Sequence, residues 1–222
     1  MKIEILEKKD NTLKFVLEGA TPAFANTLRR TMISETPVLA IEDVDIFDNN
    51  SAIYDEILAQ RLGLIPITTD PKSYNMPDDC TCKAKGCSKC TVTFALSKKG
   101  PCTVYSGDLK SSDKDAVPAD DKIPIVKLAA HQKVKLEAMA VLGRGKEHAK
   151  WQPGVISYEY FSDGKGKDAK HSGERLSPDG SRYRDDKFIF YIESNGSLKP
   201  EQIVAEAAKA LAEKAKEFEK EL

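Results

Sequence analysis

Short stretches of alternating hydrophobic and polar residues cover most of the chain. Near the amino terminus, Ile3 and Ile5 and then Leu13, Phe15 and Leu17 alternate with polar residues on either side of "KKDNT". This alternation predicts a β-hairpin with one buried face. Similar alternation, or a short apolar run, predicts further strands at 91–96, 134–142, 155–160 and 187–193.

A helical period replaces the alternation after the hairpin. A first helix is predicted from Pro22, with Thr21 as its cap, up to the Thr36-Pro37 pair that stops it. Its apolar positions recur every four residues, at Phe24, Leu28 and Met32. The segment "SAIYDEILAQRLG" predicts a second helix with Ser51 as cap and Gly63 as stop. The apolar side of this second helix is expected to hold Ile53, Ile57 and Leu62.

The last helix is predicted from Pro200 to the end of the chain. Its apolar residues keep the three-and-four spacing of a narrow seam, at Val204, Ala207, Leu211, Ala215, Phe218 and Leu222. Such a seam can dock on its own domain or pair with a helix of another chain, and periodicity does not separate the two. Together these elements indicate an α+β fold whose middle is mostly sheet. Between 161 and 186, a composition rich in Gly, Ser and charges predicts a mobile loop.

Composition limits the functional classes. The chain has 222 residues, of which 41% are hydrophobic and 31% charged, which suits one large domain or two small ones. A net charge of −1 gives no general attraction for nucleic acids. No apolar run is long enough to span a membrane, and the first residues lack a secretory signal. We expect a cytoplasmic protein, or a nuclear one if the source is eukaryotic.

Four of the five cysteines lie in "DCTCKAKGCSKC", residues 79–90. A reducing compartment disfavours disulfides, so that Cys80, Cys82, Cys87 and Cys90 are better explained as metal ligands. Zn²⁺ is favoured, an iron–sulfur cluster would use the same ligands, and an empty loop stays open as an alternative. A redox role for the last pair alone is weaker because a strand, not a helix, is predicted to follow. Cys102 is expected to be a small buried residue.

The other polar motifs of the sequence do not indicate a catalytic site. "GRGKEHAKWQPG", residues 143–154, lacks the glycine order of a phosphate-binding loop and could either dock a partner or fill the edge of a sheet. Asp43 and Asp45 would share one side of a strand, but solvated strand ends explain such acids better than a magnesium site. We therefore assign no catalytic residues.

Three segments carry a family resemblance. They are "FANTLRRTMISETPVLAIEDVDI" (24–46), "YDEILAQRLGLIPI" (54–67) and "GRGKEHAKWQPG" (143–154). In this order they resemble the family of archaeal RNA polymerase subunits called D, which is equivalent to the third-largest subunit of the eukaryotic enzymes. The bacterial α subunit N-terminal domain is similar more distantly. The resemblance extends over nearly the whole chain.

The resemblance implies an α-subunit-like dimerisation domain of antiparallel sheet plus helices, formed by residues 1–39 and 187–222. An inserted, mostly β second domain (40–186) would interrupt it and carry both the cysteine loop (79–90) and the mobile loop (161–186). The function implied is a non-catalytic assembly platform. It pairs with a small α-like subunit, called L, is joined by subunits N and P, and docks the two large catalytic subunits, so that DNA is reached only through the complex.

The resemblance also implies site residues. The partner interface would include Phe24, Leu28, Arg29, Arg30, Val204, Ala207, Leu211 and Phe218. Candidates for contact with a large subunit are Lys146, His148, Lys150 and Trp151. By likeness to eukaryotic relatives, Cys80, Cys82, Cys87 and Cys90 would hold a structural Zn²⁺. A freestanding zinc-binding adaptor for nucleic acid and a small electron carrier with a tetracysteine iron site are the alternatives.

Overall fold

The computed structural model describes residues 1–83, 85–162 and 183–222, which form two compact units. Unit 1 consists of Met1–Ile33, Gly154–Ser194 and Lys199–Leu222, and unit 2 of Ser34–Pro153 and Asn195–Leu198. Within these residues the elements are antiparallel strands and three α-helices, which confirms the predicted α+β class.

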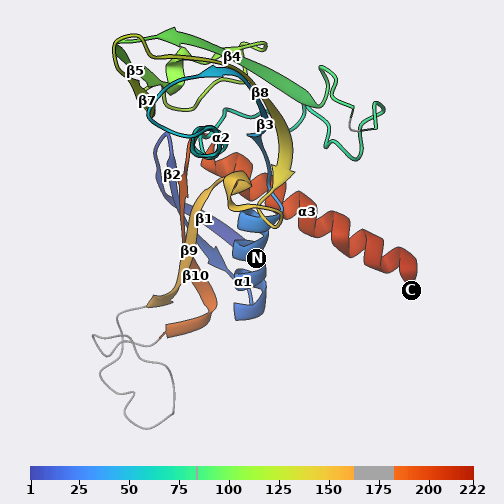
Figure 1. Ribbon diagram of the computed structural model, residues 1–222. Helices are drawn as coiled ribbons and strands as arrows, with labels where there is room; N and C mark the ends of the chain where they lie inside the picture. The colour runs from blue at the N-terminus through green and yellow to red at the C-terminus, as the bar shows by residue number, and fades with distance from the viewer. Residues whose placement is uncertain (84, 163–182) are drawn as a thin grey trace. The chain divides into compact units, whose positions relative to one another are not determined.

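Unit 1 is built on one four-stranded sheet (Figure 1). Its strands are β1 (Lys2–Lys8), β2 (Thr12–Glu18), β9 (Gly154–Ser162) and β10 (Tyr183–Ser194), in the order β1-β2-β10-β9 with antiparallel pairing throughout. The predicted amino-terminal hairpin is therefore confirmed.

The boundaries of unit 1 differ from the predicted division of the chain. The prediction assigns the residues of β9 to the inserted domain, but this strand pairs along its length with β10. The predicted boundary falls between these two consecutive strands, because strand patterns do not show which strands pair with each other. Of the predicted mobile loop, residues 163–182 lie outside the described residues, and its two ends belong to β9 and β10.

Two helices complete unit 1, α1 (Pro22–Ser34) and α3 (Pro200–Glu221). The predicted cap of α1 is confirmed, because the Phe24 N–H donates to Thr21 Oγ1 at 3.2 Å. The core of the unit includes Phe15 and Phe190, which lie opposite each other on β2 and β10 and stack with ring centroids 5.0 Å apart. This pair lies on the buried face that the alternation of β2 predicted.

Unit 2 contains a second antiparallel sheet, of order β3-β8-β4-β6. Its strands are β3 (Pro37–Asn49), β8 (Lys133–Arg144), β4 (Thr91–Lys99) and β6 (Lys110–Ser111). A separate pair joins β5 (Cys102–Tyr105) to β7 (Pro124–Leu128). The helical elements are α2 (Asp55–Gly63) and the 3₁₀ turns η1 (Ser106–Asp108) and η2 (Ala149–Trp151).

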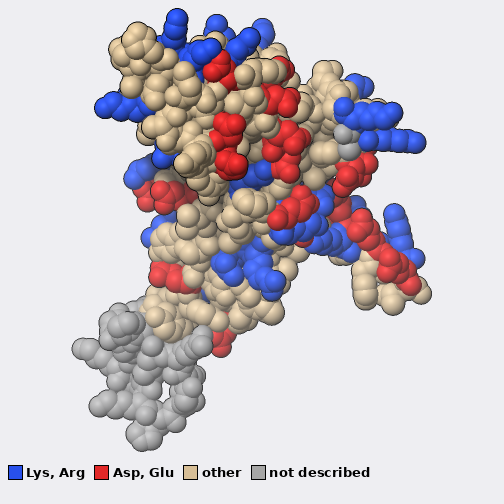
Figure 2. Space-filling model, viewed as in Figure 1, with Lys and Arg blue, Asp and Glu red and all other residues tan. Residues whose placement is uncertain are grey.

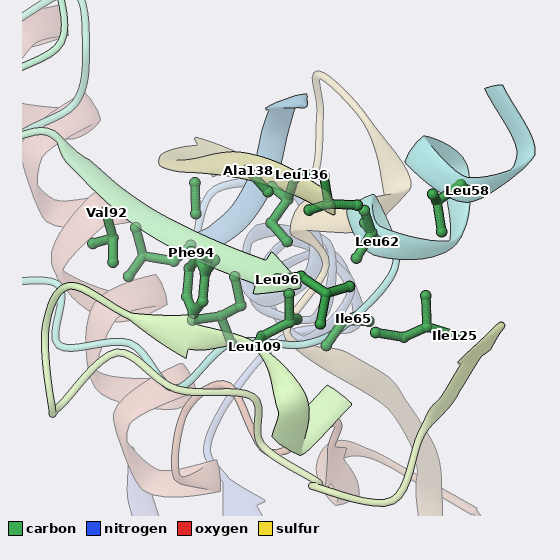
Figure 3. Close-up of a cluster of buried hydrophobic side chains, with 14 of the residues drawn as sticks. Leu58, Leu62, Ile65, Val92, Phe94, Leu96, Leu109, Ile125, Leu136 and Ala138 are labelled. Atoms are coloured by element: carbon green, nitrogen blue, oxygen red, sulfur yellow. The ribbon is translucent and has the colours of Figure 1, made fainter. Parts of the chain in front are cut away.

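The core of unit 2 joins the sheet to α2 (Figure 3). Phe94 and Leu96 of β4 and Leu58 and Leu62 of α2 contribute to one cluster of buried side chains, to which β8 and β7 also contribute. Alternate residues of β4 and β8 are buried, as a sheet with one covered face requires.

Helix α2 corrects two details of the prediction. It begins at Asp55 after Tyr54, and Ser51 instead binds Asn49 in the preceding turn. Its buried residues are Leu58 and Leu62, whereas Ile57 is 42% exposed. In a helix of nine residues, the sequence allows several apolar faces, and tertiary packing selects one of them. Among the described residues, no helix combines the length and apolarity needed to cross a membrane.

Candidate metal centre and partner surfaces

Two tight turns bring the four cysteines of unit 2 together just before β4. The Lys83 N–H donates to the Cys80 carbonyl at 2.8 Å, and the Cys90 N–H donates to the Cys87 carbonyl at 2.9 Å. Gly86, which precedes the second turn, has φ +78°, a left-handed conformation that glycine adopts without steric cost. The turns thus aim both cysteine pairs at a common point.

The sulfur positions fit a four-coordinate metal. All four Sγ atoms lie within 4.8 Å of one another. Individual Sγ–Sγ distances are 3.6 Å for Cys80–Cys87, 3.5 Å for Cys82–Cys90 and 3.7 Å for Cys87–Cys90. A tetrahedral Zn²⁺ with Zn–S bonds of about 2.3 Å places its sulfurs about 3.8 Å apart, whereas a disulfide needs about 2.05 Å. The donor set therefore fits zinc, and all four cysteines are free thiols.

The thiols influence one another's ionisation. Burial raises the pKa of Cys90, but the Cys87 N–H, Thr91 and two neighbouring thiols outweigh it and lower that pKa to about 7. Hydrogen bonding to Cys80, together with burial, raises the pKa of Cys82 to about 11. Four thiols this close cannot all ionise unless a cation compensates their charge. A bound divalent metal would supply that compensation and hold all four as thiolates.

A tyrosine–aspartate pair anchors the loop and was not found from the sequence. Tyr74 is 8% exposed and donates its hydroxyl to the Asp113 carboxylate, while the Asn75 N–H donates to the Lys89 carbonyl at 2.8 Å. The Tyr74 hydroxyl and the Asp115 N–H lower the pKa of Asp113. Burial, and then the bond to Asp113, raises the pKa of Tyr74. The two partners are 39 residues apart, so no local signal links them.

Two of the four candidates for contact with a large subunit serve the structure of unit 2 itself. Trp151 is 7% exposed, packs over Gly143, and donates its indole N–H to the Val141 carbonyl at 3.3 Å. The Lys150 ammonium lies 4.5 Å from the centre of the Trp151 ring, pairs with Glu42 and donates to the Ile41 carbonyl at 3.0 Å. These contacts agree with the second interpretation of residues 143–154, in which the motif packs at the edge of the sheet and does not dock a partner.

The other two candidates are open to solvent. Lys146 is exposed, and its ammonium lies 3.5 Å from the Glu35 carboxylate. His148 is exposed and accepts the Lys150 N–H on Nδ1 at 3.0 Å, so its other ring nitrogen is not engaged by that bond. A role of this motif in binding a partner would therefore depend on Lys146 and His148.

The predicted partner residues of α1 divide between the core and the surface. Leu28 is buried at 6% exposure, whereas Phe24 is 36% exposed. Arg29 is half-buried and donates to Asn26 Oδ1 at 3.0 Å, and Arg30 is exposed. Phe24 and Arg30 are thus the members of this set that a partner can reach most easily.

The same division runs along α3. Its buried residues, Pro200, Ile203 and Ala207, all belong to its first turns. Val204 and Leu211 are half-buried, while Phe218 is 67% exposed and Leu222 92% exposed. The apolar seam predicted for α3 is therefore buried near the start of the helix, and it is partly or largely exposed to solvent over the rest.

Surface charge does not favour the nucleic-acid alternative. On the face that Figure 2 shows, Lys and Arg side chains are interspersed with Asp and Glu side chains. Ion pairs such as Lys98–Asp108, at 2.6 Å, neutralise several of the lysines of unit 2. A nucleic-acid surface would instead require an uncompensated basic patch.

Comparison with known proteins first gives the class. Residues 44–158, more than half of the chain, match the family described as RNA polymerase Rpb3/RpoA insert domain. With the α+β fold of both units, this match defines an α-like subunit of RNA polymerase.

Curated relatives then give the particular family. The chain is 38% identical to "DNA-directed RNA polymerase subunit Rpo3" of Pyrococcus furiosus, over 100% of this chain and 97% of the relative. It is 40% identical to the protein of that name from Methanosphaera stadtmanae (97% and 96% covered) and 51% identical to that from Methanosarcina mazei (70% and 59% covered). The chain belongs to the archaeal RNA polymerase subunit Rpo3 family, which agrees with the resemblance to the family called D.

Proposed function

We propose that this chain is a non-catalytic assembly subunit of an archaeal DNA-dependent RNA polymerase and acts in the cytoplasm. It pairs with a small α-like subunit, L, joins subunits N and P, and docks the two large catalytic subunits. Its relatives are named as polymerase subunits, which supports this function over a freestanding zinc-binding adaptor. The chain reaches DNA only through the assembled enzyme.

The open half of α3 is the observation that carries the pairing proposal. A helix of 22 residues is about 33 Å long, yet its buried residues end at Ala207. Leu211, Ala215, Phe218 and Leu222 continue the apolar seam beyond that point. Exposed apolar seams are unfavourable in water and typical of helices that pair with another chain. The small α-like subunit covers this seam, together with Phe24 of α1.

The four-cysteine loop has a structural role in this proposal. Cys80, Cys82, Cys87 and Cys90 hold one Zn²⁺, which fixes the two turns before β4. The short Sγ–Sγ distances support zinc. An iron–sulfur cluster is the second candidate for the same ligands, and an absorption spectrum separates the two because zinc has no visible bands.

Co-expression with the small α-like subunit tests the pairing. Leu211→Asp places a charge in the seam and is expected to weaken the pair at least about tenfold, since a buried charge without a partner is costly. Ala212→Asp is the matched control: it adds the same charge to an exposed neighbour rotated by about 100°. A pair that survives Leu211→Asp unchanged, or a wild-type chain that forms no pair, contradicts the proposal.

A further inference from the structure

Strand β1, at the edge of the unit 1 sheet, carries apolar side chains on the side that forms the core. Ile3 lies opposite Leu17, and Ile5 lies opposite Phe15. Residues that face each other across an antiparallel pair put their side chains on the same side of the sheet. On this side Phe15 and Leu17 are 2% and 3% exposed, whereas Ile3 and Ile5 are 64% and 59% exposed. The apolar side of the sheet thus continues onto its edge strand, where it is mostly open to solvent.

The same alternation adds the first residue of the chain to this surface. Met1 is 77% exposed, and together with Ile3 and Ile5 it defines the β1 patch. Lys2 and Glu4, which lie between these residues, point to the other side of the sheet. Single exposed apolar residues are common on protein surfaces, but several grouped on one face mark an interaction site.

Helix α3 meets β1 near the start of the helix. Lys8, at the end of β1, forms an ion pair with Glu201 in the first turn of α3. Ile203 and Ala207 are completely buried, and α3 contacts β2 and β10. Its second half, 208–221, contains no buried residue, and Figure 1 shows it extending away from the sheet. This open half of α3 therefore does not cover the β1 patch of its own chain.

The β1 patch and the open half of α3 are complementary in kind and in size. Strand β1 is about 23 Å long, and residues 208–221 span about 21 Å of helix. The helix carries an apolar seam, and the strand carries an apolar side next to a buried sheet face. A helix stripe packed on a sheet face is a standard layer of α+β folds. Because the two surfaces lie apart on one chain, each is left for another chain to cover.

A pair of chains with the same fold covers both surfaces at once. In a twofold or nearly twofold pair, both chains use the same surface, so that each lays its helix on the sheet of the other. The exposed apolar residues on β1, α1 and α3 offer roughly 800 Å² of area, equal to what each partner of a standard interface buries, and either surface alone would fall short of it. They are Met1, Ile3, Ile5, Phe24, Phe218 and Leu222.

We propose that the β1 patch seats a helix of the small α-like subunit, an amphipathic helix equivalent to α3 with an apolar seam of its own. This inference rests on the proposed function and deepens it. Reciprocal packing needs a partner with the same fold, which in the proposed assembly is the small α-like subunit. The inference adds β1 to the partner surface on α1 and α3, and in the resulting pair each chain supplies one helix and one sheet face.

Co-expression of the tagged chain with the small α-like subunit tests whether β1 takes part. Ile5→Asp is expected to lower recovery of the small subunit at least about tenfold, because it places a charge without a partner under the helix. Val155→Asp is the matched control: Val155 is 71% exposed on the other edge strand, β9, and lies opposite the exposed Glu193. Melting temperatures of both isolated variants are expected to stay within about 2 °C of wild type, since no core side chain is removed.

A photo-crosslinking amino acid at position 3 identifies the occupant directly. The tagged chain with this probe is purified in the assembled polymerase, irradiated and analysed by mass spectrometry. The crosslinked peptide is expected to come from a helical segment of the small subunit that carries an apolar seam. The same probe at position 155 is the control and is expected to give no crosslink to that segment.

Several outcomes would overturn the inference. They are undiminished recovery of the small subunit after Ile5→Asp, an equal loss after Val155→Asp, and a probe at position 3 that does not reach the small subunit. A crosslink from position 3 to a second copy of this chain, or to any other subunit, would assign the patch to that occupant instead. If the wild-type chain recovers no small subunit at all, the proposed function fails, which is a distinct result.

Discussion

The four-cysteine loop and strand β4 adjoin each other in unit 2 but are ordered by different means. In β4, Val92, Phe94 and Leu96 alternate into a core where each is at most 2% exposed. In the loop, Cys80 and Cys90 are buried, while the residues between the ligands are mostly exposed and polar. The strand obtains its order from apolar burial, whereas the loop buries little apolar surface and is held by one anchoring pair and, as proposed, by a bound metal.

With the proposed metal site, this difference predicts that the stability of the loop and that of its unit are separable. A metal site can hold a short polar segment that has too little apolar surface to fold by itself. Changes in the core should therefore affect the whole unit, whereas changes in the ligands should affect the loop first.

Phe94→Ala should have the largest effect. Phe94 is completely buried in the core of unit 2, and its truncation is expected to lower the free energy of unfolding by about 3–5 kcal/mol. Urea unfolding measures the change, with Thr93→Ala on the opposite face of β4 as control. A loss below about 1 kcal/mol would show that this core does not carry the stability assigned to it.

Metal removal should affect the loop without unfolding the unit. Chelation, or Cys87→Ser, is expected to speed amide hydrogen exchange in the loop at least about tenfold and to shift the unfolding of the unit less than Phe94→Ala does. Elemental analysis should find one zinc per wild-type chain and none after Cys87→Ser, with Cys102→Ser as the control that retains it. If amide hydrogen exchange in the loop is equally fast with and without metal, the order of the loop does not depend on the metal, which contradicts this account.

Gly143→Ala tests packing that depends on distant residues. An added Cβ would lie 2.2 Å from Cε2 of Trp151, so the indole must move or the strands must separate. The expected loss is about 1–3 kcal/mol, measured by urea unfolding. Gly63→Ala is the control because its added Cβ approaches the Ile41 carbonyl only to 3.4 Å. If the two substitutions lower the free energy of unfolding equally, the contact with Trp151 does not determine the loss of stability.

Tyr74→Phe should give the smallest change, about 1 kcal/mol, for a single hydrogen bond at the base of the loop. The hydroxyl lowers the pKa of Asp113 in the folded chain, so its contribution is present above about pH 4 and is lost as the pH falls through the lowered pKa. The difference between wild type and variant should therefore shrink on acidification. A difference that stays constant from about pH 7 to below about pH 3 would show that Asp113 is not the partner.

What could be predicted from the sequence were features with local causes. The hairpin, the cap of α1 at Thr21 and the grouping of four cysteines each depend on residues a few positions apart. Local signals of this kind reflect backbone preferences and side-chain periods that hold in any context.

Features that depend on distant residues could not be predicted. The pairing of β9 with β10 joins two strands on either side of residues 163–182, and the bond between Tyr74 and Asp113 joins residues 39 positions apart. For α2, the pattern predicted Ile57 on the buried side, but packing in unit 2 buries Leu58 instead. For Lys150 and Trp151 the sequence left docking and packing at the edge of a sheet as alternatives, and the contacts of both side chains lie within unit 2.

Affinity purification of the tagged chain from its own cells tests the central claim most directly. Mass spectrometry should find the two large polymerase subunits and a small α-like subunit in amounts equal to the chain, and the eluate should synthesise RNA on a DNA template. A chain recovered alone, or with partners unrelated to transcription, would contradict the assignment as an assembly subunit.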